Sequence, residues 1–338
     1  MGSVLRIPQS WFKIILLSSV LICLTIFVWN TDFHAVLMQL QQIGIRFIGL
    51  IAITALAYFF ATWSWHVCFG AYQKNVSLYK LFSIRQVGET VGQFNPTSII
   101  AGDVLKVQLL KTTKIHEDTI TNTVLVSRIT AVLSQLALVI FAGIWLIFSS
   151  QGQVIIQAIR IPFYVLFIIL ILAKGLLLYW LSYAKPKNIA PRNPLERNNW
   201  FTKTKKQWKD ILNQIQQFYR QQQQLFWRSY ALSLVHWIVG GLEFYLILRF
   251  LSIDLSIMQG IVLDMSVLMI KSLGAFIPGQ LGIEEMGNKL MLQTLGISVG
   301  TTWITVSILR RTRQLIWVMI GFILYLFIKK EKPQLSHA

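Results

Sequence analysis

Long apolar runs separated by short polar segments make up most of the 338-residue chain. An α-helix needs about 20 mostly apolar residues to cross the hydrocarbon core of a bilayer. Stretches of this kind recur along the chain, at residues 11–29, 43–70, 120–148, 162–184, 229–250 and 299–328. The pattern predicts an all-α polytopic membrane protein with about six full spans.

The first and last of these stretches each allow two interpretations. Residues 11–29 resemble a signal peptide, but no small-residue cleavage site follows them, so we expect a membrane anchor. Three arginines, Arg310, Arg311 and Arg313, interrupt the last stretch. That stretch fits either one long broken helix or a short helix followed by a full span.

Two further stretches, residues 79–112 and 255–296, are semi-apolar and contain glycine, proline and charged residues. Irregular backbone is tolerated at membrane depth only where protein or a water-filled cavity covers it. We therefore expect two broken or re-entrant helical elements here, in addition to the full spans.

The two semi-apolar stretches share the pattern G-x-F-x-P, at residues 92–96 and 274–278. The second pattern follows the first at an offset of 182 residues, and the same offset carries Arg128 onto Arg310. This coincidence indicates an internal repeat.

Repeat one covers about 43–149 and repeat two about 225–330, and a basic loop at 185–228 separates them. In the expected topology the first span of one repeat runs inward and that of the other runs outward, so the copies are inverted. Inverted repeats interrupted by glycine and proline at matching positions are typical of transporters with a site at the repeat interface. We expect residues 1–338 to form a single integral membrane domain.

The few charged residues are strongly biased toward positive charge. Charged residues make up 13% of the chain and hydrophobic residues 55%, and the formal net charge is +18. This composition excludes soluble globular and disordered proteins. It also favours an anionic membrane leaflet over nucleic acid as the partner.

The distribution of Lys and Arg predicts the orientation. With both termini in the cytoplasm, 21 of the 31 Lys and Arg residues lie in cytoplasmic segments and four lie outside. Cytoplasmic loops are enriched in these residues. We therefore expect a multi-pass protein of a bacterial inner membrane, with its N- and C-termini in the cytoplasm.

The basic loop contains an amphipathic helical pattern from about Lys205 onward. Its apolar side chains share one face and are Trp208, Ile211, Leu212, Ile215, Phe218 and Tyr219. This pattern fits a helix lying on the inner leaflet. It also fits a docking helix for a cytoplasmic partner.

Ionisable side chains at bilayer depth cost about 2.5–3.5 kcal/mol each on insertion scales, so they require partners or water. Arginines near the two G-x-F-x-P patterns suit a phosphate headgroup, and nearby acids suit neutralisation of an empty site or proton transfer. Glycine and proline there allow the backbone to line a cavity. The candidate headgroup-binding or gating residues are Arg85, Glu89, Asn95, Pro96, Asp103, Lys106, Arg128, Lys271, Pro278, Gly279, Gly282, Glu284, Glu285, Arg310 and Arg313.

The same residues also fit a purely structural role, in which ion pairs hold the two repeats together. Glu243 and Asp264 stand alone in apolar surroundings and fit packing partners as well as functional groups. His66 and His236 lie within predicted spans and fit polar contacts between helices.

Enzyme signatures are missing from the sequence: it contains no HExxH, Walker A or Rossmann pattern. The five histidines have no metal-ligand spacing. We therefore predict that the protein is not an enzyme and uses no cofactor and no metal.

Two segments resemble the paired signatures of the lysylphosphatidylglycerol synthase transmembrane (flippase) family. The first contains RQVGE, NP and AGDVLK within residues 85–106, and the second reads FIPGQLGIEE at residues 276–285. Arg310 in the last apolar stretch also fits the family, and the resemblance covers nearly the whole chain. One departure is Ala101, where many relatives carry a second glycine.

The resemblance implies lipid translocation or handling of lipid headgroups. No soluble aminoacyl-transferase domain follows in this sequence, so the resemblance implies a stand-alone member and not lysyl transfer. We expect a flippase that moves an anionic phospholipid or polyprenyl-linked envelope lipid between leaflets, with membrane lipids as its partners. The alternatives are a scaffold that recruits a lipid-modifying enzyme through the basic loop and a small-solute secondary transporter.

Overall fold

The computed structural model is mostly helical in the part of the chain that it describes, and that part contains no strand. The described residues are 34, 38, 41, 43–92, 96–111, 115–149, 160–183, 212–273, 282–294, 296–297 and 302–328. The predicted first span and the start of the basic loop lie outside these residues.

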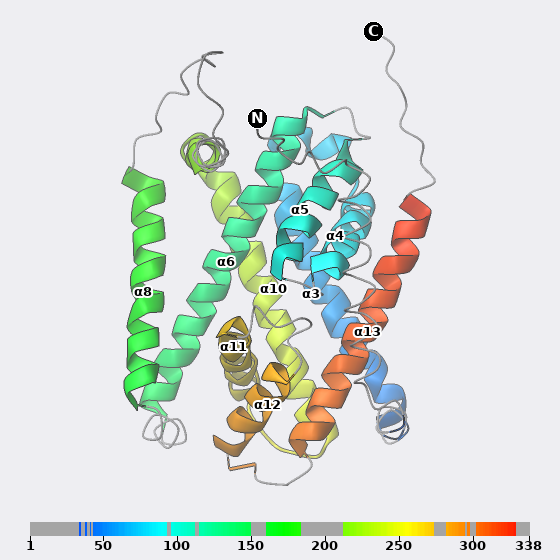
Figure 1. Cartoon of the computed structure of the whole chain (residues 1–338), viewed down its shortest axis with the longest axis vertical. Helices are drawn as coiled ribbons and strands as arrows, with labels where there is room; N and C mark the ends of the chain where they lie inside the picture. Colours follow the sequence, from blue (N-terminus) through cyan, green and yellow to red (C-terminus); the bar gives the residue numbers. More distant parts are fainter. Residues whose placement is uncertain are drawn as a thin grey trace, which may run out of the picture. The chain divides into compact units, whose positions relative to one another are not determined.

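The helices follow one another along the chain as shown in Figure 1. Their bounds are η1 Gly44–Arg46, α3 Phe47–Val67, η2 Gly70–Asn75, α4 Leu78–Gly92, α5 Pro96–Leu110, α6 Glu117–Phe148, α8 Arg160–Tyr183, α10 Gln223–Phe250, α11 Ile257–Leu273, α12 Ile283–Thr294 and α13 Thr302–Ile328.

Five helical segments in the described residues are long and apolar enough to cross a membrane. They are Gly44–Val67, Glu117–Phe148, Tyr164–Tyr183, Gln223–Phe250 and Thr302–Ile328. Each coincides with one of the spans predicted from the hydropathy pattern. The chain is therefore an all-α, multi-pass membrane protein.

The two semi-apolar stretches are broken helices, as the sequence predicts. In the first, α4 ends at Gly92 and α5 begins at Pro96. Proline suits a first helical position because its missing N–H would have no partner there. In the second, α11 ends at Leu273 and α12 begins at Ile283. The last apolar stretch, by contrast, is a single helix, α13, which continues through its three arginines.

The chain divides into two compact units, and each predicted repeat contributes residues to both. The first unit consists of Met1–Ala52, Ser83–Leu109 and Glu243–Ala338. The second consists of Ile53–Phe82 and Leu110–Leu242. The first unit therefore contains α11, α12 and α13, together with most of α4 and α5.

Within the first unit, both broken helices contact α13, which Figure 1 shows at the right. The Gln86 side-chain amide on α4 donates to the carbonyl oxygen of Trp317, in the second half of α13, at 3.3 Å. The Asn288 amide on α12 donates to the Ser307 hydroxyl, in the first half of α13, at 2.8 Å. The two broken helices thus contact opposite halves of one spanning helix, which is the arrangement expected of inverted copies.

The α4–α5 hairpin is closed by two glycines that face each other. A Cβ atom added at Gly102 would clash with the carbonyl oxygen of Gly88. A Cβ atom at Gly88 would in turn meet the side chain of Lys106. The absence of side chains at both glycines lets the two backbones approach closely and brings Lys106 against α4.

Within the second unit, hydroxyl groups join α3, α6 and α10. Ser64 Oγ lies 2.9 Å from Ser229 Oγ and 2.8 Å from Ser233 Oγ, and Thr130 Oγ1 lies 2.8 Å from Ser229 Oγ. All four side chains are buried. Small polar residues at helix contacts are typical of membrane proteins, because they allow close packing and satisfy one another.

The two histidines of the predicted spans make polar contacts with backbone carbonyls. His236 Nδ1 on α10 lies 2.8 Å from the carbonyl oxygen of Ala57 on α3, so it bridges two helices as expected. His66 Nε2 instead contacts the carbonyl oxygens of Gln73 and Val76 in the segment just after its own helix. Its contact is therefore local and not interhelical.

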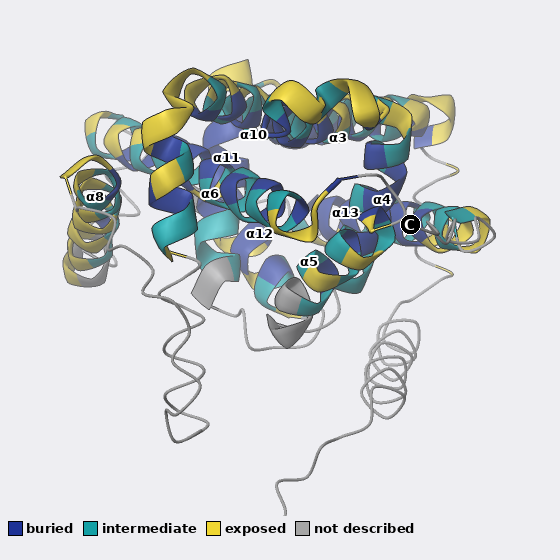
Figure 2. Cartoon of the chain, turned by 90° about the horizontal axis from the view of Figure 1, so that it is seen from above, coloured by how far each residue is buried: buried dark blue, intermediate teal, exposed yellow. Residues whose placement is uncertain are grey.

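Most of α8 is exposed or half-buried, as Figure 2 shows. Two of its residues, Phe167 and Leu181, are buried, and the Phe167 ring occupies the space beside Gly143 of α6. Its exposed side chains include Ile168, Leu172 and Leu176, which suit contact with lipid.

The described part of the basic loop is helical at residues 212–221. Ile215 and Tyr219, from its predicted apolar face, are buried against α8 and the start of α10. The Gln216 amide donates to the carbonyl oxygen of Trp180 at 3.0 Å. This part of the apolar face therefore packs against α8 and α10 and is not free to lie on the membrane surface.

Candidate functional site

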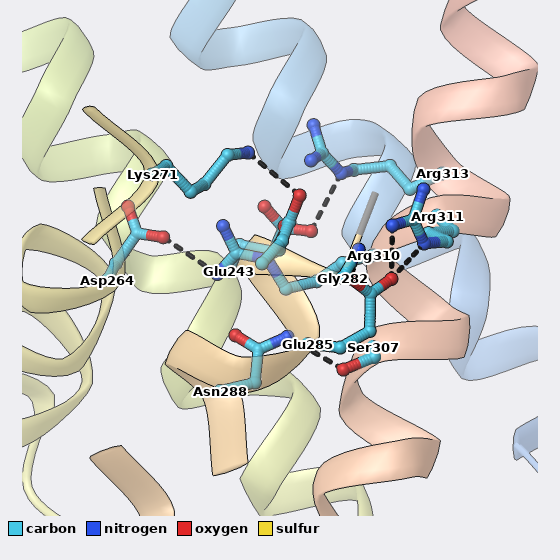
Figure 3. A network of polar contacts seen from close by, with 11 residues as sticks. Glu243, Asp264, Lys271, Gly282, Glu285, Asn288, Ser307, Arg310, Arg311 and Arg313 are labelled. Atoms are coloured by element: carbon cyan, nitrogen blue, oxygen red, sulfur yellow. Dashed lines mark hydrogen bonds and ion pairs between the residues drawn. The ribbon is translucent and has the colours of Figure 1, made fainter. Parts of the chain in front are cut away.

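Eight charged side chains of the first unit gather where α10, α11, α12 and α13 meet (Figure 3). We call them the charge cluster. They are Glu243, Asp264, Lys271, Glu284, Glu285, Arg310, Arg311 and Arg313. The cluster has four acids and four bases, so its formal charge is zero when all eight are ionised.

Arg310 forms the centre of the charge cluster. Its Nη1 donates to Asp264 Oδ1 at 2.7 Å and its Nε donates to Glu284 Oε1 at 2.9 Å. Its guanidinium carbon also lies 4.6 Å from the centre of the Phe244 ring. The Arg310 and Asp264 side chains are 5% and 8% exposed. Burial of these charges is tolerated because each guanidinium and carboxylate faces an opposite charge.

Glu284 bridges two cations. Its Oε2 accepts a hydrogen bond from Lys271 Nζ at 2.8 Å, while its Oε1 accepts from Arg310. Lys271 lies on α11 and Glu284 on α12. The Glu284 side chain therefore links α11 and α12, the two arms of the second broken helix, to each other and to α13.

Glu285 joins the start of α12 to α13. It forms an ion pair with Arg311, and its Oε2 also accepts a hydrogen bond from the backbone N–H of Gly282 at 2.8 Å. Gly282 has a φ of +83°, a conformation that favours glycine. An acid in the first turn of α12 is favourable because backbone N–H groups there carry partial positive charge.

Glu243 forms the outlying pair of the cluster. Its Oε1 lies 2.7 Å from Arg313 Nε, which is ion-pair distance. The same two atoms make no aligned hydrogen bond. We treat the contact as electrostatic, because opposite charges attract without the alignment that a hydrogen bond requires.

The charge cluster has a closed centre and a more open rim. The Glu285 side chain is 24% exposed, Lys271 18% and Arg313 13%. These values exceed those of Arg310 and Asp264 at the centre. A polar group that approaches the first unit would therefore meet the rim first.

The first broken helix contains a smaller ion-pair group of its own. Lys106 Nζ on α5 lies 2.6 Å from Glu89 Oε1 on α4 and 3.0 Å from Asp103 Oδ1. In this hairpin the acid lies on the first arm and the base on the second. In the α11–α12 hairpin the order is reversed, with Lys271 on the first arm and Glu284 on the second. In each hairpin an ion pair joins the two arms. Its first-arm member is Glu89 in one hairpin and Lys271 in the other, and these two residues are 182 positions apart, the offset of the repeat.

The remaining predicted residues are spread over the fold. Arg85 is half-buried on α4, and Arg128 is half-buried on α6 in the second unit. Pro96 is the first residue of α5. Asn95, Pro278 and Gly279 lie outside the described residues.

Three residues of the charge cluster, Asp264, Glu243 and Arg311, were not predicted as site residues. Asp264 and Glu243 stand alone in the sequence, yet they are ion partners of Arg310 and Arg313. One signal for Asp264 was present, because it lies seven residues before Lys271 and so on the same face of a helix. Arg311 was named in the sequence only as an interruption of the last stretch, and it is a full member of the cluster.

Comparisons with known proteins agree with the fold and with the paired signatures. The sequence model of the family described as the lysylphosphatidylglycerol synthase TM region matches residues 10–322. Neither the curated proteins nor the solved structures that were compared include a match. The family match extends over nearly the whole chain and includes both broken helices and the charge cluster. The chain therefore belongs to the family of lysylphosphatidylglycerol synthase transmembrane regions, and its function concerns membrane lipid.

Proposed function

We propose that the protein moves an anionic phospholipid or polyprenyl-linked lipid between the leaflets of a bacterial inner membrane. The observation that carries this proposal is the charge cluster: four guanidinium or ammonium groups held by four carboxylates beside a broken helix. Ionisable groups at membrane depth are expensive, and in membrane proteins they mark pathways for polar substrates.

The chemistry of the cluster suits a phosphate headgroup. A guanidinium binds phosphate and carboxylate with the same two-pronged geometry, so a headgroup can replace a carboxylate on an arginine. The exchange keeps each cation paired throughout, which avoids the cost of an unpaired buried charge. The rim, where Lys271, Glu285 and Arg313 are 13–24% exposed, is the first place for such an exchange.

The surrounding backbone supports the same function. α12 begins beside the cluster, and the partial positive charge of a helix N-terminus favours an anion there. The acyl or isoprenoid tail would remain in the bilayer, since only the headgroup needs a polar route. The sequence carries no Walker A pattern, so we expect passive movement or movement driven by protons or membrane potential.

We also propose the orientation that the basic residues favour, with both termini in the cytoplasm. In that orientation the basic loop faces the anionic inner leaflet, where Lys and Arg are most stable.

A leaflet-resolved assay in proteoliposomes tests the proposed function. The purified protein is reconstituted with fluorescent phosphatidylglycerol, phosphatidylethanolamine or a polyprenyl phosphate, and a membrane-impermeant quencher reports the outer leaflet. We expect the protein to make the inner pool of an anionic lipid accessible faster than protein-free vesicles do. Equal rates with and without protein for all of these lipids would overturn the proposal.

A further inference from the structure

We infer that the charge cluster takes up one proton for each net negative charge of the headgroup that it binds, and that Glu243 receives the proton. This inference rests on the proposed function and adds the ion that accompanies the lipid.

The charge cluster is balanced before a headgroup binds. The charges of its four acids and four bases already cancel, and most of these side chains are less than 20% exposed. A bound headgroup with one net negative charge would leave the cluster with an unpaired negative charge. Such a charge is strongly disfavoured at low dielectric. Protonation of one carboxylate restores neutrality at lower cost.

Among the four carboxylates of the cluster, Glu243 has the fewest stabilising contacts. Glu284 accepts hydrogen bonds from both Lys271 and Arg310. Glu285 has Arg311 and the Gly282 N–H, and Asp264 accepts an aligned hydrogen bond from Arg310. Glu243 contacts one cation, Arg313, without an aligned hydrogen bond, and its side chain is only 5% exposed.

Binding of a headgroup would change the charges around Glu243. The charged groups that act on it are Arg313 and Arg310 of α13, Asp264 of α11 and Glu284 of α12. Arg313 lies at the rim, so it is available to a headgroup phosphate. If Arg313 turns to the phosphate, the groups left nearest Glu243 include two carboxylates, and its ionised form loses its closest support. A proton from water then binds a carboxylate oxygen of Glu243, and it returns to water when the headgroup leaves.

This coupling has a consequence for the driving force. A lipid with one negative charge that crosses together with one proton carries no net charge. Its movement would follow the pH difference across the membrane and would not respond to the membrane potential.

Proton counting by titration calorimetry tests the inference. Soluble dihexanoyl phosphatidylglycerol is titrated into the purified protein in uncharged detergent, in buffers of different ionisation enthalpy. We expect uptake of about one proton per phosphatidylglycerol, with a dissociation constant that rises up to about tenfold per pH unit. Dihexanoyl phosphatidylcholine, which has no net charge, is expected to bind without proton uptake.

Two variants test the mechanism further. Glu243→Gln gives the cluster a net positive charge, so it should bind phosphatidylglycerol with no proton uptake. In infrared difference spectra of binding, the carboxylic acid band should shift in Glu243→Asp and stay in place in Glu285→Asp. A shift in Glu285→Asp alone would overturn the assignment to Glu243.

The outcomes separate this inference from the proposed function. Binding of phosphatidylglycerol by the unmodified protein without proton uptake would overturn the inference and leave lipid translocation standing. Failure of phosphatidylglycerol and of a soluble polyprenyl phosphate to bind at any pH would overturn both.

Discussion

Replacement of Arg310 by alanine is expected to lower the free energy of unfolding by about 3–5 kcal/mol, the usual cost of removing one partner from a buried ion pair. The substitution leaves Asp264 and Glu284 facing each other without the guanidinium that they share. It also removes the contact with the Phe244 ring. Unfolding in mixed detergent micelles, followed by circular dichroism, measures the change.

Arg249→Ala is the matched control for this prediction. Arg249 also pairs with an acid, Asp254, but the two side chains are 58% and 86% exposed. Exposed ion pairs contribute about 1 kcal/mol or less. If Arg310→Ala destabilises the protein no more than Arg249→Ala does, the charge cluster is not the buried network described above.

Substitution of Gly102 by alanine is expected to separate the arms of the first broken helix. The new methyl group would clash with the carbonyl oxygen of Gly88, and backbone atoms cannot move aside as a side chain can. Overpacking of this kind costs about 1–3 kcal/mol, occasionally more. Separation of the arms would also draw Lys106 away from Glu89. The free energy of unfolding measures the first effect, and the rate of lipid movement measures the second.

Gly175→Ala on α8 and Gly240→Ala on α10 are controls for the glycine substitution. A Cβ atom added at either position meets nothing within 4 Å. Alanine favours the helix over glycine by up to about 1 kcal/mol, so both controls should be neutral or slightly stabilising. Stability of Gly102→Ala equal to that of these controls would show that the hairpin is not held by close backbone contact.

The spans and the helix breaks were predictable from the sequence, because the bilayer imposes strong rules on the chain. Hydrocarbon thickness sets the length of a span, and the lack of water requires every backbone group to be satisfied within a helix. A proline and glycines in a semi-apolar stretch therefore indicate an interruption. In the structure α4 ends at Gly92 and α5 begins at Pro96, and α11 ends at Leu273 and α12 begins at Ile283.

The ion partners were not predictable in the same way. Asp264 and Arg310 are 46 residues apart, and their contact depends on how α11 and α13 are rotated about their axes. That rotation follows from packing among several helices, which hydropathy does not specify. For the same reason, the sequence does not show which cation pairs with Glu243, an isolated acid on the spanning helix α10.

Residues matched by the repeat offset have similar contacts in one case and different places in the fold in another. Glu89 and Lys271 occupy matching positions, and each pairs with an opposite charge on the second arm of its own hairpin. Arg128 and Arg310 also match in position, yet they belong to different compact units.

The central claim is that the charge cluster carries the lipid headgroup and does not merely hold helices together. The double substitution Glu285→Gln/Arg311→Gln tests it, because it removes one acid and one base and leaves the cluster neutral. The amide oxygen introduced at position 285 can still accept the hydrogen bond from the Gly282 N–H, so we expect the fold to persist. The matched control is Lys111→Gln/Glu117→Gln, an exposed ion pair of the second unit.

The decisive measurement is the rate of phosphatidylglycerol movement in proteoliposomes for this pair of double variants. A hydrogen bond to a charged group contributes about 1.5–3 kcal/mol, so loss of Arg311 should slow movement about tenfold or more. The control should move lipid as the unmodified protein does. Unchanged movement by a folded Glu285→Gln/Arg311→Gln variant would contradict a role for the cluster in carrying the headgroup.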